Sequence, residues 1–402
     1  MKKILAMALT LTMVFSITAC STSGATSGTS AAGTTPSAGA DMTAAETSAG
    51  TPAASQDPIY LGVQCRIDNA TILPQEGAIR AAKEINETGG LLGGRMIELV
   101  IEDDNMQADE AINVANKFSQ PSRKITGVIG PWTSTCTLAV YEIYEKAGIP
   151  FIVSGTAATL EELDKVNDAS YTFLGRASDR TQADIAANYV IENFDVKKIG
   201  ILYETTDYGE GGYRALDKIF KEKNYEVSAQ AIGYTDVDIT TQLIKLRQSG
   251  CEIIVAWTVN VVVASRQMFE LGMADIPVVN SSQMATASYY TQCEAAWIEN
   301  WVSVTDYFNE GDAFAQGIEA DFGHAAELSQ ACYYGYVYTM AAAIEAAGSS
   351  DPKAVRDALA AITQVETPIG IARCDESHVL NHTSVIVGFK DREPYIVGKF
   401  EL

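Results

Sequence analysis

The sequence of 402 residues has few of the groups that metal or redox chemistry requires. It contains three histidines and seven cysteines, and the cysteines form no Cys-x-x-Cys pair or Cys/His cluster with zinc-like spacing. His378 and His382 have the spacing of metal ligands on a helix, but the turn-forming residues before them argue against a helix there. We therefore expect no metal site and no cofactor.

Positive charge is also scarce, with 28 Lys and Arg against 51 Asp and Glu, and the formal net charge is −23. An acidic surface repels phosphate backbones, so we expect no nucleic-acid partner. The sequence has no Ser/His/Asp order with a nucleophile elbow and no Cys/His pair within one loop. These absences argue against an enzyme.

Long apolar runs are absent except at the N-terminus, where Lys2 and Lys3 precede an apolar run over residues 4–17. That run is shorter than the roughly 18 residues of a membrane span and is typical of an export signal. It ends at Ala19-Cys20, which resembles the lipobox of bacterial lipoproteins and implies cleavage after residue 19 and acylation of Cys20. An ordinary secretory signal is the alternative.

Residues 20–57 consist mostly of Ser, Thr, Gly, Ala and Pro, a composition that predicts a flexible tether. The globular body should therefore begin at Pro58 and lie outside the cytoplasm, lipid-anchored at the outer face of the cell membrane, or on its periplasmic side if the cell has two membranes. The six cysteines after Cys20 permit three disulfides, and free buried thiols are the alternative.

Strand-like and helix-like segments alternate through the body, which predicts an α/β fold of parallel sheets flanked by helices, with a second sheet after residue 177. The predicted strands are residues 59–64, 96–102, 125–129, 151–154, 171–176, 198–203, 226–232, 253–257, 277–280, 301–305, 385–389 and 395–399. The predicted helices are residues 77–86, 108–119, 135–147, 181–193, 212–223, 240–248, 261–271, 329–347 and 353–362.

Ligands of open parallel sheets bind beyond the carboxyl ends of the strands, so the loops there are candidate sites. Residues 130–136 and 155–159 both lead into helices, and two helix N-termini facing one cleft would hold a carboxylate. Simple capping by Ser134 and Thr159 is the alternative. The glycine-rich residues 203–212 lack the spacing of a nucleotide fingerprint, and Trp257 either fills the core or lines a pocket. Arg66 either pairs with a ligand carboxylate or is exposed.

This order of an export signal, a tether and two α/β halves resembles the type I periplasmic-binding-protein family. Within it, the chain is most similar to the branched-chain amino acid (Leu/Ile/Val) substrate-binding lipoproteins of ABC transporters. The segments that carry the resemblance are Glu76–Ala78, Ala82–Asn86, Gly89–Gly94, Glu102–Asp104, Ala115–Lys117, Gly130 with Ser134, Ile149-Pro150, Asp207–Gly209, and Arg266-Gln267 before Leu271-Gly272.

The resemblance implies two Rossmann-like lobes joined by a three-crossing hinge, with crossings near Ala177, Thr305 and Asn381. Lobe 1 would comprise residues 58–177 and 305–381, and lobe 2 residues 178–304 and 382–402. It also implies the site. Ser134 and Thr135 match the residues that hold the ligand carboxylate, and Ala157 and Ala158 match the pair that meets it with backbone groups. Tyr208 matches the tyrosine that closes over the ligand, and Trp257 an aromatic residue at the end of a second-lobe strand.

Where amino-acid binders place an acid for the ligand ammonium, this chain has Ser281-Ser282-Gln283. The aromatic residues near the cleft, among them Trp132, instead allow an aromatic or other non-amino carboxylate. We expect an ABC-importer receptor for a small branched-chain-type amino acid. The alternatives are a non-amino carboxylate or a ligand-sensing subunit without transport. The expected partners are an ABC permease and its ATPase; the chain should be a monomer that touches the membrane only through its lipid anchor.

Overall fold

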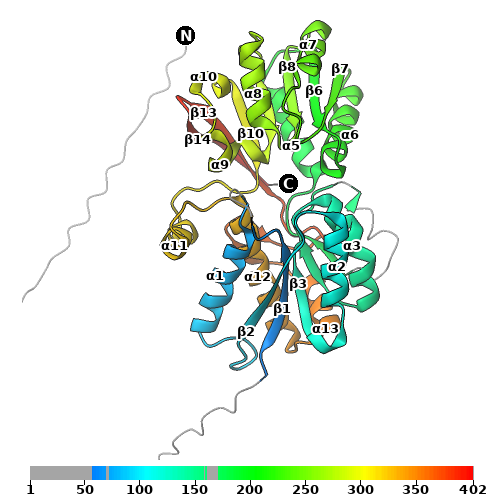
Figure 1. Ribbon diagram of the computed structural model, residues 1–402, viewed down its shortest axis with the longest axis vertical. Helices are drawn as coiled ribbons and strands as arrows, with labels where there is room; N and C mark the ends of the chain where they lie inside the picture. The colour runs from blue at the N-terminus through cyan, green and yellow to red at the C-terminus, as the bar shows by residue number, and fades with distance from the viewer. Residues whose placement is uncertain (1–56, 69–71, 158, 161–170, 402) are drawn as a thin grey trace, which may run out of the picture. The chain divides into compact units, whose positions relative to one another are not determined.

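The computed structural model describes residues 57–68, 72–157, 159–160 and 171–401. These residues form two β-sheets, each with helices on both faces, and a short hairpin (Figure 1). The predicted signal and lipidation site, including Cys20, lie outside the described residues, as does Ala158 of the candidate site. Within the described ranges, no helix is both long enough and apolar enough to cross a membrane.

The first sheet has five parallel strands in the order β2-β1-β3-β4-β5. The strands are β1 (Ile59–Cys65), β2 (Ile97–Asp103), β3 (Ile125–Ile129), β4 (Phe151–Val153) and β5 (Thr172–Leu174). The helices around them are α1 (Pro74–Glu87), α2 (Ala108–Phe118), α3 (Ser134–Ala147), α11 (Ala313–Phe322), α12 (Leu328–Ala347) and α13 (Pro352–Ala360), with the 3-10 turn η1 (Pro121–Arg123). We call this assembly the first body.

Side-chain alternation along β1 divides the first body's core into two layers. Ile59, Leu61 and Val63 are fully buried in a cluster with α1, α12 and α13, whereas Tyr60 packs toward α2 and α3 on the opposite face. The close approach of α1 to α12 depends on Gly77, because a Cβ there would lie 2.0 Å from the carbonyl oxygen of Gln330. A helix contributed by the last third of the chain therefore completes the first body.

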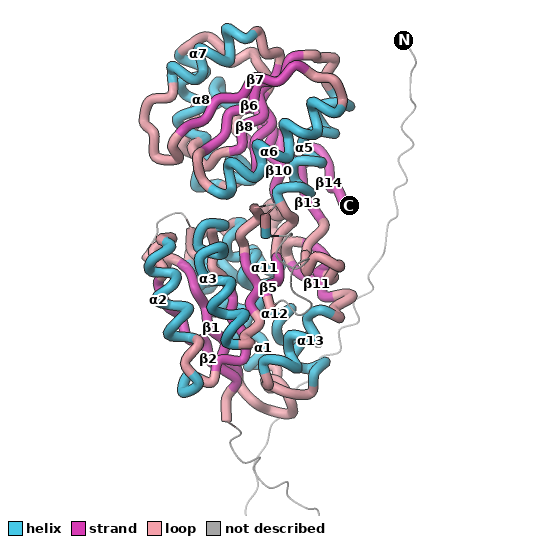
Figure 2. The backbone as a smooth tube through the Cα atoms, turned by 90° about the vertical axis from the view of Figure 1, so that its right-hand side faces the viewer, coloured by secondary structure: helices cyan, strands magenta, loops and turns pink. Residues whose placement is uncertain are grey.

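The second sheet has seven strands in the order β14-β13-β10-β9-β8-β6-β7. The strands are β6 (Lys198–Glu204), β7 (Glu226–Ile232), β8 (Ile253–Trp257), β9 (Val278–Ser281), β10 (Trp301–Thr305), β13 (Thr383–Lys390) and β14 (Glu393–Glu401). The associated helices are α5 (Asp179–Asn193), α6 (Asp207–Glu222), α7 (Thr240–Ser249), α8 (Val261–Glu270), η3 (Ser282–Ala285), α9 (Ala287–Tyr290) and α10 (Ala295–Ile298). Figure 2 shows α5 and α6 beside this sheet, and both contribute to one of its two core clusters, while α7 and α8 contribute to the other. We call this assembly the second body.

The predicted α/β class is confirmed, and individual elements also agree closely with the sequence pattern. The strand predicted over residues 253–257 is β8 at the same bounds, and the helix predicted over residues 329–347 is α12. The pattern missed α11, which begins after Asp312, whose carboxylate accepts a hydrogen bond from the Ala315 N–H. It also missed the hairpin of β11 (Val365–Thr367) and β12 (Gly370–Ala372), and it did not indicate that β13 runs antiparallel to β10.

Three chain segments pass between the two bodies, after β5, after β10 and before β13. Asp306 joins all three. The Arg176 Nε donates a hydrogen bond to Asp306 Oδ2 at 2.5 Å, and the Asn381 Nδ2 donates to Asp306 Oδ1 at 3.4 Å. The ion pair is almost completely buried, with side-chain exposures of 6% and 0%. Each connecting segment is therefore held to the others by charge-assisted or amide hydrogen bonds.

Candidate ligand-binding site

The loop between β3 and α3 is shaped by a glycine and capped by a threonine. Gly130 has a φ of 101°, and a Cβ there would lie 2.0 Å from the carbonyl oxygen of Gln64. The cap of α3 is Thr133, whose side chain accepts a hydrogen bond from the Cys136 N–H. The capping role considered for Ser134 is therefore wrong, because Thr133 occupies that position and Ser134 is the first helical residue.

The hydroxyl of Ser134 instead joins the two loops expected to hold a carboxylate. Its oxygen accepts hydrogen bonds from the backbone N–H groups of Thr156 and Ala157, each at 3.1 Å. Ser134 and Ala157 are only 3% and 1% exposed. One hydroxyl and two convergent backbone donors at a helix N-terminus form a setting that favours negative charge.

Thr135 lies on the exposed side of the same helix start and contacts the second body. Its hydroxyl donates a hydrogen bond to Asp207 Oδ2 at 2.7 Å. Asp207 is the first residue of α6, and Thr206 caps that helix by accepting from the Gly209 N–H. Two helix N-termini, one from each body, therefore meet through this bond.

Tyr208 and Gln283, both predicted site residues, lie together in the second body. The Tyr208 hydroxyl donates to Ser281 Oγ at 2.5 Å and lies 3.4 Å from Gln283 Oε1. Burial raises the pKa of Tyr208 well above its ordinary value, and the negative charge of Asp179 raises it further. The phenol therefore remains a hydrogen-bond donor at every physiological pH.

Trp257 lies beneath Tyr208 and is fully buried. The two ring centres are 6.2 Å apart at an interplanar angle of 36°. A Cβ at Gly212 would come within 2.1 Å of Trp257 Nε1, so α6 packs directly on the indole. In this conformation Trp257 supports the ring of Tyr208, and direct contact with a ligand stays a prediction.

Trp132, a predicted aromatic of the first body, is half-buried between Tyr333 and Arg176, and of these two neighbours only Arg176 was not expected near the cleft. The Trp132 ring centre is 6.2 Å from that of Tyr333 and 5.8 Å from the guanidinium carbon of Arg176. Arg176 also reaches the second body, because its Nη2 donates to Ser282 Oγ at 2.7 Å. Arg176 thus contacts Trp132, a predicted site residue, on one side and Ser282 on the other.

The electrostatics of Arg176 follow from its burial and its partner. Burial is the largest single effect and opposes the charge of the guanidinium, but the neighbouring groups, Asp306 foremost among them, together raise the pKa of Arg176 above its ordinary value. No sequence pattern marked this arginine, since it ends a strand-like run much as an exposed residue would. Arg66, which was considered as a ligand partner, has a side chain that is 40% exposed and pairs with Asp68 at 3.5 Å.

Glu204, another residue that was not predicted, positions the loop that precedes Tyr208 and the loop that follows Trp257 in the second body. Its Oε1 accepts from the Thr206 hydroxyl at 2.6 Å, and its Oε2 accepts from the Val259 N–H at 2.7 Å. Burial raises the pKa of Glu204. The carboxylate thus fixes the loop after β6 against the loop after β8.

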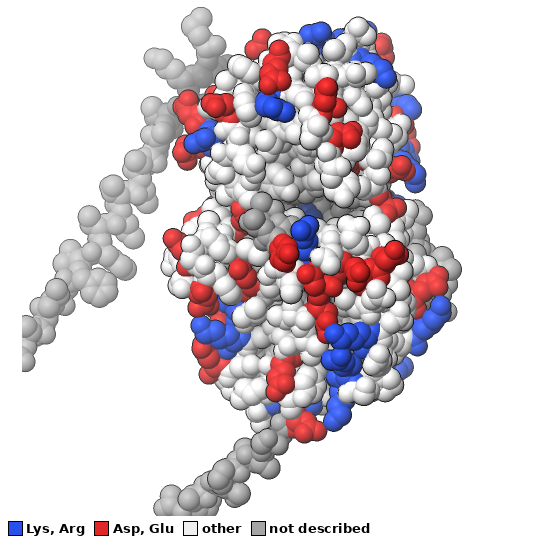
Figure 3. Space-filling model, in the orientation of Figure 1, with Lys and Arg blue, Asp and Glu red and all other residues white. Residues whose placement is uncertain are grey.

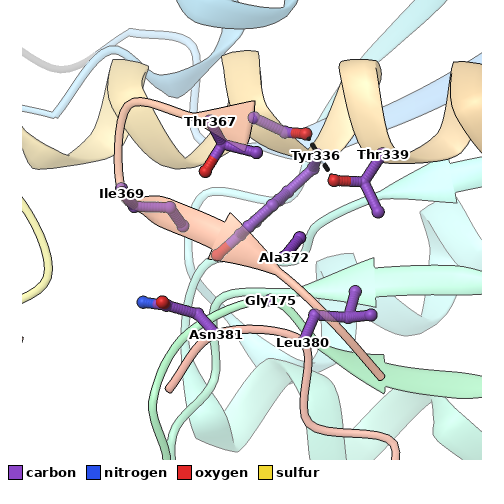
Figure 4. Close-up of a pocket in the computed structure, with 9 residues that line it drawn as sticks. Gly175, Tyr336, Thr339, Thr367, Ile369, Ala372, Leu380 and Asn381 are labelled. Carbon is purple, nitrogen blue, oxygen red and sulfur yellow. Dashed lines mark hydrogen bonds between the residues drawn. The ribbon is translucent and has the colours of Figure 1, made fainter. Parts of the chain in front are cut away.

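An enclosed cavity of about 10 Å³ lies near the connecting segments, between α12, the β11–β12 hairpin and residues 380–381. Figure 4 shows the Tyr336 ring extending from α12 across this cavity toward the hairpin, with Leu380 and Asn381 on the side opposite Thr339. The volume suffices for about one water molecule. It is far too small for an amino acid, so this cavity is not the candidate site.

Among the described residues there is no group of three His, Cys, Asp or Glu side chains placed to hold a metal ion. The structure shows no disulfide between the cysteines of the described ranges, and all except the half-buried Cys374 are buried. Burial raises the pKa of Cys136 to about 12 and also that of Cys251, which leaves both as unreactive thiols. Acidic side chains, with basic ones interspersed, are spread over the face drawn in Figure 3.

A sequence model of the family described as "Periplasmic binding protein" matches residues 71–393. The Leu/Ile/Val-binding protein homolog 1 of Brucella abortus is 28% identical over 314 residues, which cover 75% of this chain and 81% of the relative. The leucine-, isoleucine-, valine-, threonine-, and alanine-binding protein of Pseudomonas aeruginosa is 26% identical over 314 residues, covering 76% of this chain and 81% of the relative.

Two solved structures share the fold. The branched-chain amino acid transporter substrate-binding protein LivJ of Streptococcus pneumoniae, in complex with isoleucine, has a TM-score of 0.75 at 24% identity, covering 86% of this chain and 99% of that one. A solute-binding protein of Rhodopseudomonas palustris, in complex with 3,4-dihydroxybenzoic acid, has a TM-score of 0.74 at 16% identity, covering 86% and 98%. The chain therefore belongs to the periplasmic binding protein family, whose members are extracytoplasmic substrate-binding proteins of ABC transporters and not enzymes.

Proposed function

We propose that this protein is the receptor of an ABC importer and that it binds one small carboxylate-bearing solute between its two bodies. The observation that carries the proposal is the convergence of the Ser134 hydroxyl with the N–H groups of Thr156 and Ala157. The two N–H groups donate to the Ser134 oxygen, so a ligand carboxylate would accept from the Ser134 O–H at the start of α3, where the helix dipole favours negative charge. Thr135 and Ala158 are proposed to border the same position.

The second body supplies the other wall of the proposed site. Tyr208 and Gln283 lie together there, Trp257 supports the tyrosine ring, and Trp132 of the first body lies beside Arg176, which is hydrogen-bonded to Ser282. Binding would favour a closed state by adding contacts that only the closed state provides. The proposed lobes are residues 58–177 with 305–381 and residues 178–304 with 382–402, so that the hinge coincides with the segments that meet at Asp306.

The relatives favour an aliphatic amino acid as the solute, since several carry leucine, isoleucine and valine in their names. The second candidate is a non-amino carboxylate. It is favoured by the absence of an acid from residues 281–283 and by the family neighbour in complex with 3,4-dihydroxybenzoic acid. Both candidates use the same carboxylate position.

The N-terminal residues define the proposed placement in the cell. Residues 1–19 are proposed as a lipoprotein signal peptide, Cys20 as the acylated residue and residues 21–57 as the tether. The receptor would then be a monomer held at the membrane by its lipid alone and would deliver its solute to a permease driven by an ATPase. Metabolic labelling with a radioactive fatty acid tests the anchor, and Cys20→Ser should abolish incorporation.

A thermal-shift screen of the purified full chain tests the binding proposal. The panel contains the aliphatic and aromatic amino acids and their non-amino carboxylates. A ligand present at one hundred times its dissociation constant should stabilise the protein by about 2.7 kcal/mol. A shift with any member supports the proposal, and no shift across the panel contradicts it.

A further inference from the structure

Residues 281–283 match the position at which amino-acid binders place an acid for the ligand ammonium. In this chain the guanidinium of Arg176 lies beside that segment. The Arg176 Nη2 donates to Ser282 Oγ at 2.7 Å, and the guanidinium carbon lies 5.8 Å from the Trp132 ring centre. The arginine therefore lies between the first-body aromatic and the second-body segment, at the border of the proposed site.

The guanidinium is fixed on one side and retains donors on the other. Its Nε and Nη2 are engaged by Asp306 Oδ2 and Ser282 Oγ, whereas its Nη1 makes no hydrogen bond within the described residues. The Arg176 side chain is 6% exposed, so only a small part of it reaches solvent. A planar fork with one free edge suits an oxygen acceptor.

Asp306 does not offer a substitute acceptor for an ammonium. Its side chain is 0% exposed, and its two oxygens accept from Arg176 and Asn381. An ammonium beside Ser282 would therefore meet the donors and the positive charge of Arg176, and donor against donor in a buried site is costly. A hydroxyl, a carbonyl or a second carboxylate oxygen would instead accept from Nη1.

We propose that Arg176 determines ligand specificity in this protein, and that the solute is a carboxylate whose second polar group is an oxygen rather than an ammonium. This inference rests on the proposed function, because it assumes that the carboxylate binds at Ser134. It favours the non-amino carboxylate over the amino acid because of the position of Arg176. The competing prediction comes from Asp179, a fully buried acid whose charge acts on Tyr208 and which would be the acid if an amino acid bound.

Matched ligands isolate the group beside the carboxylate. Leucine, 4-methyl-2-oxopentanoate and 4-methylpentanoate share one side chain and one carboxylate, and phenylalanine, phenylpyruvate and 3-phenylpropionate form the aromatic set. We expect isothermal titration of the full chain to show that the 2-oxo acid of one set binds at least about tenfold more tightly than its amino acid, equivalent to about 1.4 kcal/mol. It should also bind more tightly than the acid that lacks the second polar group.

Two variants and one control variant connect this preference to Arg176. Ser282→Glu provides an acid that pairs with Arg176 and accepts from an ammonium, so it should shift the preference toward the amino acid by at least about tenfold. Ser303→Ala removes another fully buried hydroxyl, on the neighbouring strand β10, and should leave the preference unchanged. Arg176→Lys keeps the charge opposite Asp306 but loses the planar fork, and it should weaken 2-oxo acid binding while the protein stays folded.

Each outcome is decisive. If the amino acid of either set binds more tightly than its 2-oxo counterpart in the wild type, the inference is overturned, Asp179 becomes the candidate acid and the proposed function survives. If Ser282→Glu leaves an observed 2-oxo preference unchanged, Arg176 and its surroundings do not set specificity. If no member of either set and no other carboxylate binds, the proposed function fails, and the inference fails with it.

Discussion

Replacing Asp104 by asparagine should change the pH dependence of stability. Asp104 follows β2, is 1% exposed, and has its Oδ2 buried without a hydrogen-bond partner among the described residues. Burial raises its pKa from 3.8 to about 6. The charged form is therefore disfavoured in the folded protein relative to the unfolded chain, where the carboxyl is hydrated.

The groups facing Asp104 have smaller effects than burial and act in both directions: the Met106 N–H and the Gln64 side chain lower its pKa, and Asp103 raises it. Asp103 adds a like charge from the same strand, while the Met106 N–H donates to Asp104 Oδ1 at 3.0 Å and opposes the shift. Cys136 and Tyr144 of α3 lie close enough for the Asp104 charge to raise their own pKa values. Desolvation therefore dominates.

The sign follows from proton linkage. Between pH 3.8 and about 6 the folded protein binds more protons than the unfolded chain, so the contribution of Asp104 to stability is largest below pH 3.8 and is lost as the pH rises through 6. A shift of about two units corresponds to about 3 kcal/mol over the whole titration, with roughly half of it between pH 5 and 8. Asp104→Asn retains the Oδ1 acceptor and removes this loss.

Urea unfolding of the wild type and of Asp104→Asn at intervals from pH 5 to 8 measures the effect. The variant should gain stability relative to the wild type as the pH rises, by roughly 1.5 kcal/mol across this window. Asp103→Asn is the matched control, because it removes a neighbouring charge and leaves the buried carboxyl in place, so its pH dependence should resemble that of the wild type. If the free energy of unfolding varies with pH in the same way in the wild type and in Asp104→Asn, burial does not raise the pKa of Asp104 as described.

Three further predictions concern packing, the contact between the bodies and the thiols. Gly77→Ala should destabilise the protein by about 1–3 kcal/mol in thermal or urea unfolding, because its Cβ would lie 2.0 Å from the Gln330 carbonyl oxygen; an unchanged midpoint would show that α1 and α12 are not packed as described. Asp207→Ala removes the acceptor of the Thr135 hydroxyl and should weaken ligand affinity severalfold by loosening the contact between the bodies, and equal affinity in a titration would contradict this. With Ellman's reagent, Cys374 should react first among the cysteines of the described ranges, and fast reaction of several thiols in the native state would contradict their burial.

Much of the fold follows from local sequence pattern. The strand over residues 253–257 is a short continuous apolar run and the helix over residues 329–347 is a long apolar segment, and both appear with nearly the predicted bounds. The direction of β13 could not be predicted in the same way, because pairing with β10 is a long-range choice set by the connecting segment before it. α11 was missed because the flanking polar residues conceal a short apolar face.

The candidate site, like the fold, could be predicted from the sequence only in part. The loops after parallel strands were predicted to hold the ligand, and the structure brings Ser134 and Ala157 of two such loops into hydrogen-bond contact, while their binding of a ligand stays a prediction. Arg176 could not have been found, because its importance comes from Asp306, a residue 130 positions away in the chain. Only the folded protein reveals that these two charges lie together at the segments that join the bodies.

The most direct test of the central claim is an isothermal titration of the wild type, Ser134→Ala and Tyr208→Ala with the carboxylate that gives the largest thermal shift. Ser134 lies in the first body and Tyr208 in the second, so a solute bound between the bodies depends on both. We expect binding of one solute per chain and at least about tenfold weaker affinity in each folded variant, a loss of about 1.4 kcal/mol or more. Wild-type affinity in both variants would contradict it.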